Sequence, residues 1–160
     1  METVRIGVVG DTHGHVANVV EAINRIKPLD FIIHLGDYAE DGPMIEEAVG
    51  IEVIGVKGNC DFNSTLPEDR LLTIGGKKIF ITHGHRYDVK HTYHKIFYKA
   101  LEVEADVVLF GHTHMMARFV EDDILIMNPG SVSHPRGHLE KTFALLEIGK
   151  EVVSEILIIS

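Results

Sequence analysis

The sequence has little of three things: cysteine, long apolar runs and positive charge. Its single cysteine, Cys60, excludes an internal disulfide and is typical of a reducing cytoplasm. No apolar run reaches the roughly 20 residues of a membrane span, so we expect no membrane contact. Acidic residues outnumber lysine and arginine by 24 to 15. Without a basic face, the chain is poorly suited to long nucleic acid as a partner.

What remains is the composition of an ordinary globular protein, with 45% hydrophobic and 24% charged residues. A length of 160 residues suits one core, so we expect a single domain over residues 1–160. The N-terminus leads directly into a predicted strand, which predicts no signal peptide and a cytoplasmic location. Eleven histidines are many for this length. Several of them follow apolar runs, which indicates a metal site.

The first half of the chain alternates predicted strands and helices. Apolar runs predict strands over residues 4–9, 31–35 and 51–56. Helical spacing predicts a helix over residues 16–26, and a second short helix, capped by Asp41-Gly42-Pro43, that carries Ile45, Ala48 and Val49. Strands joined through helices pair in parallel, so the carboxyl ends of these strands should lie at one edge of a sheet.

The second half contains mostly hairpin signals. These predict paired strands over 70–74 and 78–82, 117–120 and 124–127, and 142–148 and 152–159. A helix over 91–104 and a buried strand that ends near Phe110 are also expected. Hairpins imply antiparallel pairing. The pattern therefore predicts an α/β (α+β) domain in which two packed sheets have helices on their outer faces.

Five predicted strands end in side chains of the kinds that bind metal ions. The five segments are Asp11-x-His13, Gly36-Asp37, Gly58-Asn59-x-Asp61, His83-Gly84-His85 and Gly111-His112-x-His114. Parallel pairing would place Asp37 beside Asp11, where two carboxylates repel each other unless a cation lies between them. Carboxylate and imidazole ligands favour Mn, Fe, Ni or Zn over Ca.

Several of these residues have a second interpretation. Asp11 could begin a helix with His13 facing solvent, and the segment around Asn59 has the composition of an ordinary turn. His34, inside a strand, is expected to be buried and hydrogen-bonded rather than a ligand. Cys60 is expected near the site but not on a metal, because a hard, oxygen-rich site disfavours sulfur. His85 could face either a substrate or the solvent.

As a set, the five motifs resemble the calcineurin-like metallophosphoesterase superfamily from Gly10 to about Ser131. The short chain and the Asn59-Cys60-Asp61 variant are similar to the small YfcE-type phosphodiesterases. The resemblance implies a four-layer α/β/β/α sandwich of two mixed β-sheets flanked by helices. It also implies two metal ions that share Asp37. The first would be held by Asp11, His13, Asp37 and His114, and the second by Asp37, Asn59, His83 and His112.

The implied reaction is hydrolysis of a small phosphodiester or phosphomonoester through in-line attack by a hydroxide that bridges two ions. Mn²⁺ is the expected metal, and Ni, Zn, Fe and Co also suit the ligands. The catalytic residues would be Asp37, Asn59, His83, Cys60 and Asp61. Asn59 and His85 would contact the substrate.

Cys60 departs from the family pattern, since many members carry a histidine there that protonates the leaving group. A thiol is a poor replacement, so esters with poor leaving groups should react slowly. Asp61 is expected either to orient Cys60 or His85 or to be only a turn residue, and Asn128 and Ser131 to line or support the site.

The resemblance also leaves other functions open. One alternative is a non-catalytic metal-binding interaction scaffold of the same fold, as in a retromer subunit. A purely structural metal site ranks last, because such sites are usually rich in cysteine. Relatives often form homo-oligomers, so a second copy of the chain is an expected partner.

Overall fold

The computed structural model describes residues 3–136 and 140–159, and in this part of the chain ten strands form two five-stranded sheets. The first sheet has the order β10-β9-β1-β2-β3, with bounds Val152–Ile159, Lys141–Ile148, Val4–Val9, Phe31–His34 and Val53–Gly55. The second has the order β4-β5-β6-β8-β7, with bounds Asp69–Ile74, Lys77–Thr82, Val107–Leu109, Ile124–Asn128 and Ala117–Glu121.

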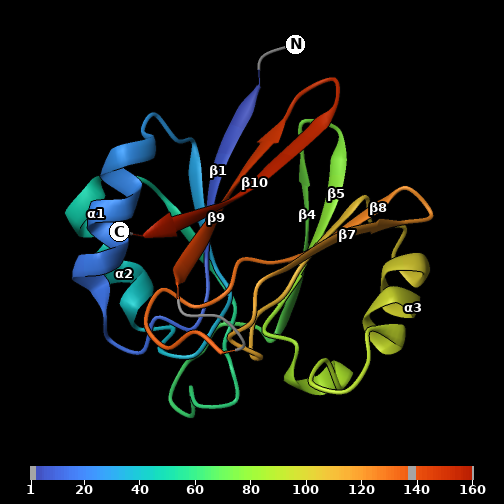
Figure 1. Ribbon diagram of the computed structural model, residues 1–160, viewed down its shortest axis with the longest axis horizontal. Helices are drawn as coiled ribbons and strands as arrows, with labels where there is room; N and C mark the ends of the chain where they lie inside the picture. Colours follow the sequence, from blue (N-terminus) through green and yellow to red (C-terminus); the bar gives the residue numbers. More distant parts are fainter. Residues whose placement is uncertain (1–2, 137–139, 160) are drawn as a thin grey trace.

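Helices cover the outer face of each sheet (Figure 1). Helices α1 (Val16–Ile26) and α2 (Asp41–Val49) lie on the first sheet, and α3 (His94–Glu102) lies on the second. A short 3-10 helix, η1 (His85–Tyr87), follows β5. The predicted α/β/β/α sandwich of two mixed sheets is confirmed.

The apolar runs of the strands are explained by burial on both faces. Successive side chains of a strand point to opposite sides, so β1 contributes Ile6 and Val8 to the layer between the sheets and Val9 to the layer under the helices. Helix α1 packs Val19 and Ile23 into that second layer. Continuous apolar strands followed by polar loops are the expected result.

The second sheet differs from its prediction. All three hairpins form, but the centre of this sheet is parallel. Helix α3 returns the chain so that β6 pairs in parallel with β5, and β8 then pairs in parallel with β6. The last hairpin joins the first sheet, where β9 runs antiparallel to β1. The helix expected over 91–104 is shorter and begins at His94.

This arrangement places the candidate ligands together. The loops after β1, β2, β3, β5 and β6 leave the two sheets at the same end of the sandwich, the lower end in Figure 1. These loops carry all seven predicted metal ligands. Within the residues described, no helix is both long and apolar enough to span a membrane.

Candidate metal centre

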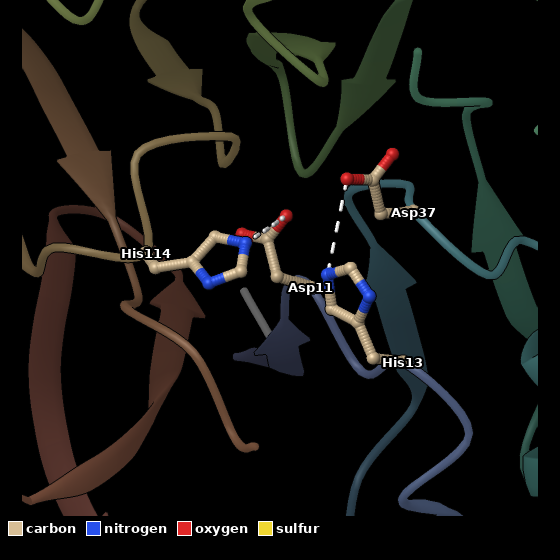
Figure 2. Close-up of side chains that lie close together, drawn as sticks. All are labelled: Asp11, His13, Asp37 and His114. Carbon is tan, nitrogen blue, oxygen red and sulfur yellow. Dashed lines mark ion pairs between the residues drawn. The ribbon is translucent and has the colours of Figure 1, made fainter. Parts of the chain in front are cut away.

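Four side chains from three loops converge at this end (Figure 2). Asp11, His13, Asp37 and His114 each offer one ligand atom, and these atoms lie within 4.8 Å of one another. The His114 Nε2 atom is 3.4 Å from Asp11 Oδ1, and His13 Nε2 is 3.9 Å from Asp37 Oδ2. The structure therefore brings together the four residues assigned to the first ion.

Asp11 lies at the centre of this group and is fully buried. Neither of its carboxylate oxygens accepts a hydrogen bond within the described part of the chain, and the His13 Nε2 atom is also buried without a hydrogen-bond partner. A buried carboxylate without a partner is costly, and a cation held between these groups would remove that cost. The donor set thus fits a divalent transition-metal ion.

Part of the second predicted ligand set lies beside the first. The His83 Nε2 atom is 3.5 Å from Asp37 Oδ1 and 3.2 Å from the Nδ1 atom of His112. Asn59 is exposed, and its turn reaches Asp37 through the backbone N–H of Cys60, which donates to Oδ1 at 3.1 Å. The structure therefore brings together three of the four residues assigned to the second ion, Asp37, His83 and His112. The contact from the Asn59 turn is made by the Cys60 backbone and not by the Asn59 side chain.

Backbone carbonyls set the orientation of two of the imidazoles. His83 donates from Nδ1 to the carbonyl oxygen of Leu35, and His114 donates from Nδ1 to that of His134, both at 2.7 Å. These bonds leave each Nε2 atom facing the carboxylates. A fixed tautomer of this kind is typical of metal-binding histidines.

The ligand loops are held in a strained backbone conformation. Five of the seven predicted ligands have φ between 45° and 69°, namely Asp11, His13, Asp37, His112 and His114. This left-handed region is unfavourable for residues other than glycine, and such strain gathers at functional sites. The surrounding sandwich therefore stabilises a loop geometry that the ligands would not adopt alone.

At Asp37 and His112 the electrostatics favour the charge states that a cation needs, whereas at His83 and His114 burial lowers the pKa but contact with Asp37 and Asp11 raises it on balance. Burial opposes ionisation of Asp37, but contact with His83 and the Cys60 amide keep the pKa of this carboxyl below its usual range. Burial, together with the charge of His83, lowers the pKa of His112 to about 4. Near neutral pH, Asp37 therefore offers a carboxylate and His112 offers a neutral imidazole.

A buried chain of hydrogen bonds supports the loop that carries His13. His34 accepts from the Gly36 N–H, so its Nε2–H donates to the Thr12 hydroxyl at 2.9 Å. That hydroxyl donates to Asp41 Oδ2 at 2.5 Å, and the same oxygen accepts from the Gly14 N–H. The predicted buried role of His34 is confirmed. The role of Asp41 was missed, because its sequence position indicates only a helix cap.

Polar residues at the end of β8 and just after it fix the same loop after β1 and, in addition, the loop after β6. The hydroxyls of Ser131 and Ser133 donate to the Asp11 carbonyl oxygen at 3.0 and 2.8 Å. The Asn128 amide donates to the carbonyl oxygen of Gly111 and to the Thr113 hydroxyl. Asn128 and Ser131 therefore support the site through backbone contacts. Ser133 was not found from the sequence, because a serine that contacts a distant carbonyl leaves no pattern.

The remaining predicted residues lie at the rim. The half-buried His85 has its ring centroid 5.5 Å from that of His83. Asp61 accepts from the backbone N–H groups of Gly58 and Ala39 at 2.7 and 2.9 Å, so it fixes the turn rather than orienting Cys60 or His85. Cys60 is exposed as a whole. The pKa of its thiol is nevertheless raised, first by partial desolvation and then by the negative charge of Asp37.

Replacing Asp41 by alanine should weaken metal binding without unfolding the chain. The change removes the acceptor that joins Thr12 to Gly14, so the loop carrying His13 loses its support. Loss of such an outer contact typically lowers metal affinity about 10- to 100-fold. Calorimetric titration of metal-free protein with Mn²⁺ measures the effect. Glu47→Ala, at an exposed position of the same helix, is the matched control; equal affinities in the two variants would contradict the role given to Asp41.

The chain is similar to known proteins over most of its length. Residues 4–151 match the calcineurin-like phosphoesterase superfamily domain. The chain is 33% identical over 150 residues to the probable metallophosphoesterase YsnB of Bacillus subtilis, covering 92% of this chain and 86% of that protein. It is 32% identical over 108 residues to the phosphodiesterase YfcE of Escherichia coli, covering 62% and 54%. A crystal structure of a predicted phosphoesterase from Streptococcus pneumoniae superposes with a TM-score of 0.84 at 36% identity, covering 99% and 91%.

A two-sheet sandwich with a cluster of aspartates and histidines at its loop end fits a metallophosphoesterase. The chain belongs to the calcineurin-like phosphoesterase superfamily. Its relatives include proteins named metallophosphoesterase and YfcE phosphodiesterase, so the resemblance seen in the motifs is confirmed.

Proposed function

We propose that the chain is a phosphodiesterase that uses two divalent metal ions to hydrolyse small phosphate esters. The observation that carries the proposal is the Asp11 carboxylate, which is fully buried and accepts no hydrogen bond from the residues that the structure describes. The Nε2 atoms of His114 and His83 face it at 3.4 and 3.9 Å. This arrangement supports a site that can hold a metal ion, and turnover distinguishes an enzyme from a non-catalytic metal-binding scaffold of the same fold.

Asp11, His13, Asp37 and His114 would hold one ion. Asp37, His83 and His112 would hold the second, with Asn59 turning inward from its exposed position to complete the set. When bound, the ions supply an activated water and positive charge for the phosphoryl oxygens. Mn²⁺ is the ion we expect, and Ni, Zn, Fe and Co suit the same ligands.

The residues of the chain prepare the site for this chemistry. The carbonyls of Leu35 and His134 hold the His83 and His114 rings in place, so little reorganisation is needed when a phosphate arrives. The Cys60 thiol has a raised pKa and is a weak acid. Esters whose leaving groups depart without a proton should therefore react fastest.

The net charge of −9 supports small esters over long nucleic acid. The single cysteine supports a cytoplasmic location.

Hydrolysis of bis(p-nitrophenyl) phosphate tests the proposal. Protein stripped of metal by a chelator should release no p-nitrophenolate above the buffer rate, and added Mn²⁺ should restore turnover. Absence of turnover with Mn²⁺, Ni²⁺, Co²⁺ and Zn²⁺, in protein shown to be folded and metal-loaded, would contradict the proposal.

A further inference from the structure

A cavity of about 810 Å³ opens beside the metal centre. On the side of the metal centre, the cavity is lined by His13 and Cys60. From there the cavity extends between the start of α2 and the loop that follows β3. Its volume is in the range of small-molecule sites, roughly 300–1,000 Å³. An organic group esterified to a phosphate at the metal centre could therefore extend into it.

Two aromatic side chains line this cavity. Phe62 is 89% exposed, so the burial of apolar area does not explain a phenylalanine at this position. Tyr38 is 40% exposed, and its ring lies against the ring of His13 with a centroid distance of 5.0 Å. Exposed rings beside a metal centre are suited to stacking against a flat ligand.

The same hydrogen-bonded bridge holds both aromatic residues at the cavity. The Asp61 carboxylate accepts from the Ala39 N–H at 2.9 Å and from the Gly58 N–H at 2.7 Å. Ala39 directly follows Tyr38, and Asp61 directly precedes Phe62. The bridge therefore joins the two loops at the positions next to the rings, so Phe62 is presented by an anchored turn although its side chain is exposed.

The charges around the cavity limit what it can accept. Three carboxylates line it, from Glu40, Glu46 and Asp61, against one guanidinium, from Arg70. Arg70 donates to the carbonyl oxygen of Gly55 at 3.3 Å, which ties its positive end to the backbone. A second phosphate or a carboxylate on the ligand would therefore be repelled, whereas an uncharged group would not.

From these observations we propose that the cavity is the binding site for the organic part of the substrate, and that this part is a flat aromatic group without a further anionic substituent. The inference rests on the proposed function, because the metal centre must hold the phosphate to which the group is attached. Phe62 and Tyr38 contact the aromatic group, and the surrounding carboxylates exclude anionic derivatives. Substrates with one phosphate and an uncharged aromatic group should therefore be preferred.

Binding of two non-hydrolysable phosphonates tests this inference without turnover. Calorimetry on Mn²⁺-loaded protein compares phenylphosphonate with methylphosphonate, which share the phosphonate but not the ring. Wild-type protein should bind the phenyl compound at least about tenfold more tightly, as expected for stacking on one aromatic side chain. Phe62→Ala should remove most of this difference, and Phe62→Trp should retain it. Tyr98→Ala, an exposed aromatic position on α3, is the matched control and should bind as wild type.

A charged analogue tests the second half of the inference. The compound 4-carboxyphenylphosphonate should bind more weakly than phenylphosphonate, and Glu40→Gln should narrow this difference. Equal affinities of wild-type protein for the phenyl and methyl compounds, or a preference unchanged in Phe62→Ala, would overturn the assignment of the cavity and leave the proposed function standing. Absence of binding by every phosphonate would overturn the proposed function and the cavity assignment with it.

Discussion

Asp37→Ala should abolish the metal-dependent hydrolysis of bis(p-nitrophenyl) phosphate. Asp37 is the carboxylate placed between the two ligand groups, since one oxygen lies 3.9 Å from His13 Nε2 and the other 3.5 Å from His83 Nε2. Under the proposed two-ion function, its removal would take a ligand from both ions at once. We expect kcat to fall about 10³-fold or more, because the charge stabilisation of the transition state depends on both ions. Steady-state release of p-nitrophenolate with saturating Mn²⁺ measures the loss.

The control for this variant is Glu47→Gln, which removes an exposed carboxylate from α2 and should keep wild-type activity. Circular dichroism and thermal unfolding should show that both variants are folded. A folded Asp37→Ala variant that retains more than about a tenth of the wild-type rate would be inconsistent with a carboxylate shared by two ions.

Gly58→Ala should also reduce activity strongly, although less than Asp37→Ala. A methyl group on Gly58 would collide with Asp37 Oδ1 and would lie 2.6 Å from the Asp37 backbone nitrogen. The carboxylate or the turn must therefore move. A displacement of about 1 Å in a catalytic group can reduce the rate roughly 10²-fold, and we expect a loss of that size in kcat/KM. The assay with bis(p-nitrophenyl) phosphate measures it.

Gly10→Ala is the matched control. Gly10 is also buried and precedes a ligand loop, but an added methyl group would meet its nearest neighbour, the Gly130 carbonyl oxygen, at 3.5 Å, an ordinary contact. Neither Gly10 nor Gly58 has a positive φ, so the two variants differ in steric contact rather than in backbone preference. Similar activity in the two variants would rule out the collision with Asp37 as the cause.

Local patterns predicted most of the elements, and the family resemblance implied the first ligand set. The helix expected over 16–26 has those bounds in the structure, because its apolar spacing and the following Lys27-Pro28 segment are both local signals. Asp11 and Asp37 could be placed together because β1 and β2 are joined through α1, which makes them parallel neighbours. Motifs at the ends of such strands therefore indicate positions in space as well as in sequence.

Non-local pairing and polar support were beyond these patterns. The parallel pairing of β6 with β8 joins segments whose sequences contain only a strand signal and a hairpin signal. The hydrogen bonds of Asp41 to the loop of Thr12, and of Ser133 to the Asp11 carbonyl, depend on how separate loops pack. Asn59 was predicted as a ligand from its motif, yet the residue is exposed. The exposure of a residue depends on how the loops pack, which a motif does not show.

Counting bound manganese tests the central claim, two ions held around Asp37, most directly. Metal-free protein is dialysed to equilibrium against saturating Mn²⁺, and the metal content per chain is measured by mass spectrometry. We predict two ions per chain for the wild type and one for His112→Ala, which loses a ligand of the second ion only. A single ion per wild-type chain at saturation, with His112→Ala unchanged, would contradict the two-ion account.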